Sequence, residues 1–128
     1  MNEETQRREY VVLLPGREDV WEQATPEQRA ATYGVHEKFA RTLAERGHLV
    51  TGGAELAHSR EAKVVRGGAG GTVTQGPYAE TVEQLTGFYL VESSDLDDLL
   101  EICGLLADAE GGVEVRPTVA PPTEGAPS

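Results

Sequence analysis

The chain has 128 residues, a length that suits one domain, and it carries a formal net charge of −11. The charge is uneven, because residues 1–66 hold eleven acids and ten bases whereas residues 67–128 hold eleven acids and one base, Arg116. A surface this acidic repels phosphate backbones and anionic lipids, which excludes nucleic acid and a polybasic membrane contact as partners.

One domain is predicted over residues 9–119. Residues 1–8 are polar and are expected to be flexible, and a disordered Pro-rich tail is expected over residues 120–128.

The first expected element is a strand. Residues 10–14 are an apolar run closed by Pro15-Gly16, which is typical of a strand buried on both faces. A polar loop that contains Trp21 is expected next.

A helix follows this loop. Thr25 is a favourable N-cap residue, proline occupies the first helical position, and Gln28 stands where the reciprocal capping bond is made. The helix is expected to run to about Arg46 and to stop at Gly47. Its predicted buried stripe has a spacing of four and consists of Ala31, Val35, Phe39 and Leu43.

The middle of the chain predicts short strands. Residues 49–51 form a strand that ends at a glycine pair, and residues 62–66 and 72–74 flank a glycine-rich turn over residues 67–71, which indicates a hairpin. No helix follows this turn and no lysine lies in it, so it is not a phosphate-binding loop.

The last third predicts strand, helix and strand. Residues 88–91 are a doubly apolar strand, Ser93-Ser94 is the expected cap, a helix covers about 95–108, and residues 113–116 alternate as a final strand. The whole order predicts an α+β fold, a ferredoxin-like βαβ-βαβ arrangement with an added hairpin.

Two of these strands, 10–14 and 88–91, are apolar on both faces, yet the two helices cover only one face of the sheet. A second copy that packs sheet to sheet is the simplest cover, so a symmetric homodimer is predicted.

Location and thiol chemistry are bounded by composition. No apolar run approaches the roughly 20 residues that span a bilayer, and the start lacks the features of a secretory signal, so we expect a cytoplasmic protein without a membrane contact. Cys103 is the only cysteine, which excludes an intrachain disulfide. It is interpreted as a buried small hydrophobe, with a reactive thiol as the alternative.

His36 is the candidate catalytic residue. It follows Val35 and precedes Phe39 by three residues, so its ring is expected at the margin of the buried stripe, where a half-shielded imidazole suits general acid–base chemistry. The alternative is a histidine held by a neighbouring side chain without a chemical role. The three histidines are too dispersed for a zinc motif, and neither a metal site nor a cofactor is expected.

Residues 75–85 and the last strand supply candidate ligand-binding residues. Tyr78 offers a ring with a hydroxyl, and Glu80 and Glu83 lie one helical turn apart, although an ordered turn with capping acids explains them equally well. Arg116 points away from the side chain of Val115 and is either an ion-pair partner or a ligand for an anionic substrate.

The chain resembles the YCII-related family in its DGPF subgroup. Residues 75–81, together with 83–85 and 87–89, resemble the subgroup signature D-G-P-F-A-E-T-K-E-x-L-x-G-Y-Y, and residues 114–117 match its closing E-V-R-P. The opening half is matched by Trp21, by residues 25–27 and by His36, Phe39, Leu43 and Gly47.

The resemblance implies a dimeric α+β barrel with a pocket between sheet and helix. In YCII-type members a histidine on the first helix pairs with an aspartate as an acid–base dyad, and one such enzyme is a dehydrochlorinase of a chlorinated hydroxyhydroquinone. His36 matches that histidine. The signature aspartate is Gln75 here, and no aspartate occurs between Asp19 and Asp95. The carboxylates weighed as substitutes are Glu55, Glu61 and Glu80.

Three functions follow from this. The first is a small, cofactor-free dimeric enzyme that uses His36 on a small aromatic or phenolic substrate. The second is a non-catalytic ligand-binding or regulatory dimer, which the missing aspartate favours. Some members of the subgroup are encoded beside or fused to extracytoplasmic-function sigma factors, which places this second function in a stress-linked setting. The third is a structural dimer without a pocket.

Overall fold

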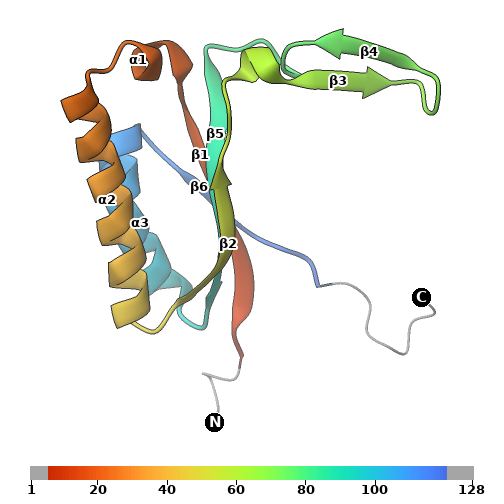
Figure 1. Cartoon of the computed structure of the whole chain (residues 1–128). Helices are drawn as coiled ribbons and strands as arrows, with labels where there is room; N and C mark the ends of the chain where they lie inside the picture. Colours follow the sequence, from red (N-terminus) through yellow and green to blue (C-terminus); the bar gives the residue numbers. More distant parts are fainter. Residues whose placement is uncertain (1–5, 121–128) are drawn as a thin grey trace, which may run out of the picture.

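Two long helices pack on one face of a four-stranded sheet in the computed structural model, which describes residues 6–120 (Figure 1). The elements in chain order are β1 (Arg8–Arg17), α1 (Glu18–Glu22), α2 (Pro26–Glu45), β2 (Leu49–Glu55), a 3₁₀ turn (Ser59–Glu61), β3 (Lys63–Arg66), β4 (Thr72–Gln75), β5 (Glu83–Ser93), α3 (Leu96–Glu110) and β6 (Glu114–Pro117). Most of the two ends expected to be flexible, residues 1–8 and 120–128, lies outside the described residues.

The main sheet has the strand order β2-β5-β1-β6, and all of its neighbouring pairs are antiparallel. The units β1-α2-β2 and β5-α3-β6 are therefore interleaved, with one strand of each unit lying between the two strands of the other. This arrangement confirms the predicted α+β class and is compatible with a ferredoxin-like topology. Strands β3 and β4 form a separate two-stranded sheet, as the glycine-rich turn predicted.

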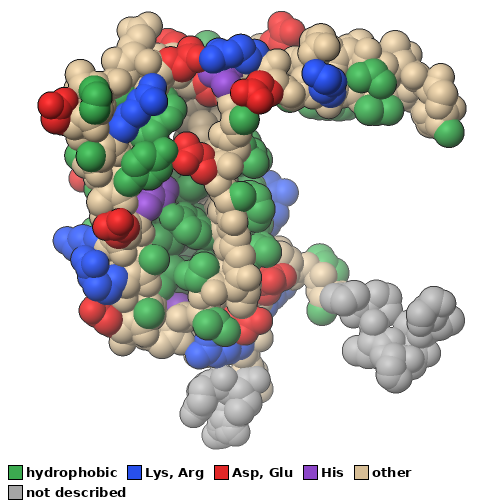
Figure 2. All heavy atoms as spheres, viewed as in Figure 1, with side chains coloured by type: hydrophobic (Ala, Val, Ile, Leu, Met, Phe, Trp, Pro, Cys, Tyr) green, Lys and Arg blue, Asp and Glu red, His purple; other side chains and the backbone are tan. Residues whose placement is uncertain are grey.

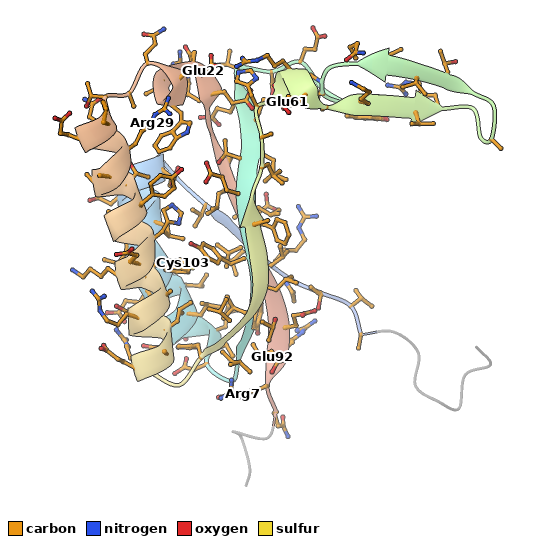
Figure 3. All side chains as sticks on the ribbon, viewed as in Figure 1. Arg7, Glu22, Arg29, Glu61, Glu92 and Cys103 are labelled. Atoms are coloured by element: carbon orange, nitrogen blue, oxygen red, sulfur yellow. The ribbon has the colours of Figure 1, made fainter. Side chains whose placement is uncertain are left out.

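The core lies between the sheet and the two helices, where Cys103 points (Figure 3). It follows from the alternation of β1, whose residues at every second position face the helices. The buried apolar residues are Tyr10, Val12, Leu14, Phe39, Leu43, Val91, Leu99, Ile102, Cys103 and Leu106. The predicted stripe of α2 is half correct. Phe39 and Leu43 are buried, Val35 is partly buried and Ala31 is exposed, because the first half of α2 borders a cleft instead of the core.

The start of α2 forms as expected. The Thr25 hydroxyl accepts a bond from the Gln28 backbone N–H at 3.1 Å, and the Gln28 side chain accepts one from the Thr25 N–H at 2.9 Å. Two N–H groups at the helix start thus gain partners. Gly47 follows the helix with a φ of 88°, a conformation that costs glycine little.

Several boundaries differ from those predicted. Strand β1 continues through Pro15 to Arg17 across a register shift, and the expected polar loop around Trp21 contains the short helix α1. Glu83 begins β5, so it and Glu80 do not share a helical turn. Asp95, not Ser94, caps α3 by accepting from the Asp98 N–H at 3.1 Å. Local propensity does not predict the added lengths of β1 and β5, because pairing with a neighbouring strand creates them.

The β3–β4 hairpin projects from the body on the side of the sheet opposite the helices (Figure 1). Apolar side chains lie on its surface (Figure 2). Val65 and Val73 are directly paired across its two strands and are 64% and 57% exposed. An isolated two-stranded hairpin is marginally stable in water, and this arm, formed by β3 and β4, keeps these two apolar side chains exposed. No helix among residues 6–120 is long and apolar enough to cross a membrane.

Candidate functional site

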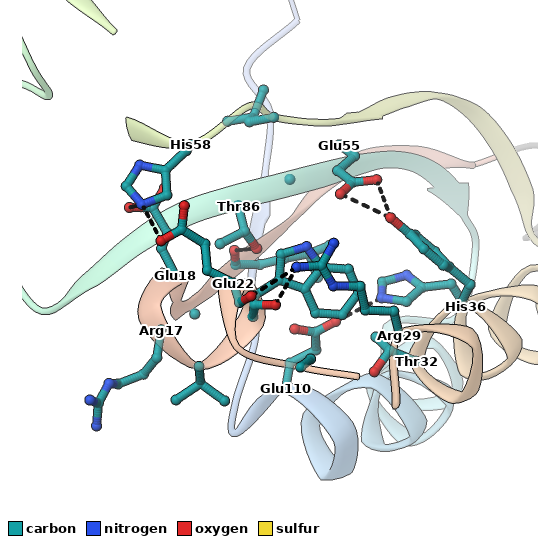
Figure 4. Close-up of a pocket in the computed structure, with 18 of the residues that line it drawn as sticks. Arg17, Glu18, Glu22, Arg29, Thr32, His36, Glu55, His58, Thr86 and Glu110 are labelled. Atoms are coloured by element: carbon teal, nitrogen blue, oxygen red, sulfur yellow. Dashed lines mark hydrogen bonds and ion pairs between the residues drawn. The ribbon is translucent and has the colours of Figure 1, made fainter. Parts of the chain in front are cut away.

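An open cleft of about 1110 Å³ lies between α1, α2, the C-terminal end of α3 and the strands β1, β2 and β5. Figure 2 shows a hollow between α2 and β2 in which histidine and apolar side chains are visible, and Figure 4 shows the residues of this cleft. Aromatic rings from three elements contribute to its walls: Trp21 from α1, Tyr33 from α2 and Tyr89 from β5. Its geometry is therefore that of a site for a small organic molecule.

His36 lies in this cleft between a phenol and a carboxylate. Its Nδ1 is 2.7 Å from the Tyr89 hydroxyl oxygen, and its Nε2 is 2.7 Å from a carboxylate oxygen of Glu110. The side chains of His36 and Glu110 are 19% and 18% exposed, so both are shielded from water but reachable from the cleft. The Tyr89 ring also stacks on the imidazole, with the ring centroids 5.8 Å apart.

The hydrogen bonds assign the proton of the neutral imidazole. The carboxylate of Glu110 only accepts, so the Nε2–H of His36 donates to it, and the Tyr89 O–H donates to Nδ1. Burial, and next to it the charge of Glu110, raises the pKa of Tyr89, which keeps its hydroxyl proton in place. The Glu110 carboxylate stabilises the imidazolium that forms when Nδ1 takes up a proton. This is an arrangement suited to general acid–base chemistry.

Three elements position these groups. His36 is one helical turn before Phe39, which is fully buried and fixes the rotation of α2. Tyr89 projects from the helix-facing side of β5, where its ring lies 5.1 Å from that of Phe39. Glu110 is the last residue of α3, followed by Gly111 with a φ of 90°.

The acid partner of His36 is therefore Glu110, which sequence reasoning missed. Of the three carboxylates weighed for this role, Glu55 lines the cleft but accepts from the Tyr33 hydroxyl at 3.0 and 3.2 Å instead. Neither Glu61 nor Glu80 lines the cleft. The predicted helix ended at residue 108, so no local signal directed attention to Glu110.

A second group of residues closes the end of the cleft near α1. The Glu18 carboxylate accepts from the N–H and the hydroxyl of Ser59 at 2.7 and 2.6 Å, and Arg60 pairs with Glu22 at 2.5 Å. The Arg60 bond lowers the pKa of the Glu22 carboxyl, which is therefore ionised near neutral pH. His58 lies 3.6 Å from Glu18. These contacts hold the chain after β2 against α1.

The predicted ligand-binding residues do not join His36. Tyr78 is 77% exposed, and its ring contacts the guanidinium of Arg66 on the projecting arm. Glu80 is also exposed. Glu83 begins β5 opposite Arg17. Arg116 lies outside the cleft and pairs with Glu114 through its Nε at 3.0 Å, which is the contact that the ion-pair alternative describes. A ligand-binding role for these four residues stays a prediction.

Among residues 6–120, no three histidine, cysteine, aspartate or glutamate side chains gather in a group that could hold a metal ion. Several polar groups that face the cleft pair with one another or with backbone carbonyls, among them His36 with Glu110 and Tyr33 with Glu55.

Comparison with known proteins agrees with the resemblance. A model of the YCII-related domain family matches residues 9–120. An uncharacterized protein of Rhizobium meliloti (strain 1021) is 43% identical over 68 residues, a stretch that makes up 50% of this chain and 55% of that protein. The match thus spans about half the length of this relative.

Proposed function

The chain belongs to the YCII-related domain family, and from this premise we propose that it binds a small organic molecule in the cleft and transfers a proton on it with His36. The observation that carries the proposal is the hydrogen-bonded series Tyr89–His36–Glu110 at the cleft wall. Proton transfer by a positioned histidine typically contributes about 10²- to 10⁴-fold to a rate.

In this proposal each member of the series has a different task. Nδ1 of His36 is the group that accepts or returns a proton, after a substrate atom replaces the Tyr89 hydroxyl as its partner. Glu110 orients the ring through Nε2 and balances the charge that develops. The Tyr89 hydroxyl, released from Nδ1, remains beside the substrate as a hydrogen-bond donor. No cofactor is needed for such a step.

A non-catalytic binding or regulatory dimer is the second function considered. It was favoured by the absence of an aspartate partner for the histidine. Glu110 at 2.7 Å supplies a carboxylate in that place, which supports the acid–base function over it.

The experiment is a screen of small phenols and organic acids for exchange of C–H hydrogens with deuterated water, followed by NMR. We expect the wild-type protein to accelerate exchange in at least one bound compound, His36→Gln to lower that rate about 100-fold or more, and Glu110→Gln to lower it less. The matched control is His48→Gln, because His48 lies outside the cleft. Compounds that bind in the cleft without any exchange or conversion would identify a binding module instead.

We also propose that the protein is a homodimer in which two sheets face each other. Val11, Leu13, Phe88 and Leu90 lie on the sheet face opposite the helices, where they pair across β1 and β5. The projecting arm extends on this same side (Figure 1). A second copy covers both surfaces at once and gives the dimeric barrel that the family resemblance implies.

A further inference from the structure

We propose that the cleft contains a separate subsite for a carboxylate at Arg29, and that its ligand is therefore an organic acid with a planar or aromatic body. This inference rests on the proposed function only where it says that the ligand extends from Arg29 toward His36. The anion subsite itself does not depend on the proposed function. It starts from a guanidinium whose hydrogen-bonding capacity is only partly used.

Arg29 is fixed at one end only. Its Nη2 donates to the backbone carbonyls of Trp21 at 2.8 Å and Glu22 at 3.2 Å, and its guanidinium lies 5.1 Å from the centre of the Trp21 ring. Arg29 and Glu22 are seen together at this end of the molecule in Figure 3, and Figure 4 shows Arg29 at the cleft. The backbone bonds and the ring set the orientation of the fork.

The rest of the guanidinium has donors without acceptors. Among residues 6–120, Nε of Arg29 is the one buried side-chain nitrogen or oxygen without a hydrogen-bond partner, and Nη1 makes no bond to the described residues. Arg29 also has no carboxylate within ion-pair distance there, whereas the other arginines of the cleft, Arg17 and Arg60, each have one. Charged N–H groups of arginine that lack an acceptor are groups that proteins use to bind carboxylates.

The position of Arg29 sets the direction in which the ligand extends. Arg29 and His36 are seven residues apart on α2, which places them on the same side of the helix about 10 Å apart along its axis. A carboxylate held at Arg29 thus directs the remainder of the molecule along the cleft toward the imidazole. A benzene ring that carries a carboxylate and a second polar group in the para position presents its two polar ends in opposite directions, which suits a ligand that extends from Arg29 toward His36.

The wall between the two groups is aromatic. Tyr33 lies between them on α2, and its ring meets Trp21 edge to face with the centroids 5.6 Å apart. Tyr89 adds a ring beside His36. Rings in these orientations favour a flat apolar body by stacking and edge contacts.

Glu55 offers the opposite charge in the same cleft. The two oxygens of its carboxylate share the single Tyr33 hydroxyl donor, so part of its capacity is used, whereas Arg29 retains unused donors on Nε and Nη1. An amine ligand held at Glu55 is therefore the competing outcome of the test.

The test compares three probes that share one ring and differ in charge: 4-hydroxybenzoate, 4-hydroxybenzamide and 4-hydroxybenzylamine. Binding is measured by calorimetry and by the fluorescence of Trp21, the sole tryptophan of the chain. We expect the acid to bind at least about tenfold more tightly than the amide, and Arg29→Met to abolish this preference. Arg29→Lys, which keeps the charge but not the fork, is expected to retain a smaller preference.

The matched control is Arg41→Met, the same change at an exposed arginine of α2 that lies outside the cleft. It is expected to leave the preference unchanged. The subsite is refuted when the amide or the amine binds as well as the acid, when the acid fails to bind at millimolar concentration, or when Arg29→Met keeps the preference. His36→Gln should retain it, so an intact preference without any proton exchange refutes the proposed function and leaves the subsite standing.

Discussion

His36 has both ring nitrogens engaged, and its two neighbours act in different ways. The Tyr89 hydroxyl is a neutral group that a substrate can replace, whereas the Glu110 carboxylate is a charge that holds Nε2. Because the two contacts come from β5 and from the end of α3, the orientation of the ring depends on the packing of α3 against the sheet. The imidazole is therefore positioned by the fold as a whole.

Cys103 shows the opposite case of a chemically reactive side chain that the fold makes inert. It is 3% exposed in the core, and burial raises the pKa of its thiol to about 11. Because the thiolate is the nucleophile, we expect no reaction with Ellman's reagent at pH 8 in the native protein. One equivalent of thiol should react after addition of denaturant. Rapid reaction of the native protein would instead indicate the reactive thiol that the sequence left open.

At the scale of elements, the closeness of β2 to β5 depends on Gly53. Its φ is 150°, and a Cβ placed there would meet the carbonyl oxygen of Phe88 at 2.6 Å. We expect Gly53→Ala to force β2 away from β5 and to lower the free energy of unfolding.

The matched substitution is Gly34→Ala in α2, where an added Cβ meets nothing within 4 Å. Alanine is a better helix former than glycine, so this variant should gain about 0.5–1 kcal/mol in the free energy of unfolding. Urea denaturation followed by circular dichroism measures both changes. Equal effects of the two substitutions would contradict the close contact between the strands.

A polar cluster connects the C-terminal end of α2 with the first turn of α3. Nε2 of His48 donates to the Asp98 carboxylate at 2.8 Å, and Arg46 also pairs with Asp98. The His48 bond first, and then the Arg46 bond, lower the pKa of the Asp98 carboxyl. A lowered native pKa stabilises the fold above the usual aspartate pKa of about 4, and this contribution is lost as the pH falls through the native value.

Asp98→Asn should therefore lower the melting temperature at pH 7, and the difference from wild type should shrink below about pH 4. Asp97→Asn, the same change at the exposed neighbouring residue, is the control and should have little effect at either pH. Thermal unfolding by circular dichroism over this pH range gives the comparison. A difference in melting temperature between Asp98→Asn and wild type that grows on acidification would contradict this prediction.

At the scale of the whole molecule, the proposed homodimer depends on the sheet face opposite the helices. Leu90 lies on this face between Val11 and Gly52, in the two central strands and the neighbouring edge strand. Leu90→Glu places a charge in the proposed interface, where its burial costs several kcal/mol. We expect the wild type to have a dimer mass by light scattering with sizing, and the variant to have a monomer mass at micromolar concentration.

Leu100→Glu is the control, because Leu100 is 45% exposed on α3 and not on the sheet. This variant should remain dimeric. A monomer mass for the wild-type protein at micromolar concentration would contradict the proposed interface.

Much of the architecture follows from local signals. The capping residues Thr25 and Gln28 determine where α2 begins, and the apolar runs at 10–14 and 88–91 mark the two central strands. The sequence also identified His36 correctly as a half-shielded histidine beside the core stripe. These features depend on residues within one or two turns of each other, so their physical causes can be read along the chain.

Tertiary structure alone determines which carboxylate pairs with His36 and which donors of Arg29 stay unused. Glu110 is 74 residues from His36 in sequence, and the two meet only because α3 ends beside the middle of α2. Arg29 becomes a candidate subsite because its Nη2 is used by backbone carbonyls of α1, a short helix that local propensity did not indicate. Long-range packing determines which charged side chains become neighbours, and these contacts cannot be inferred from composition or from residue spacing.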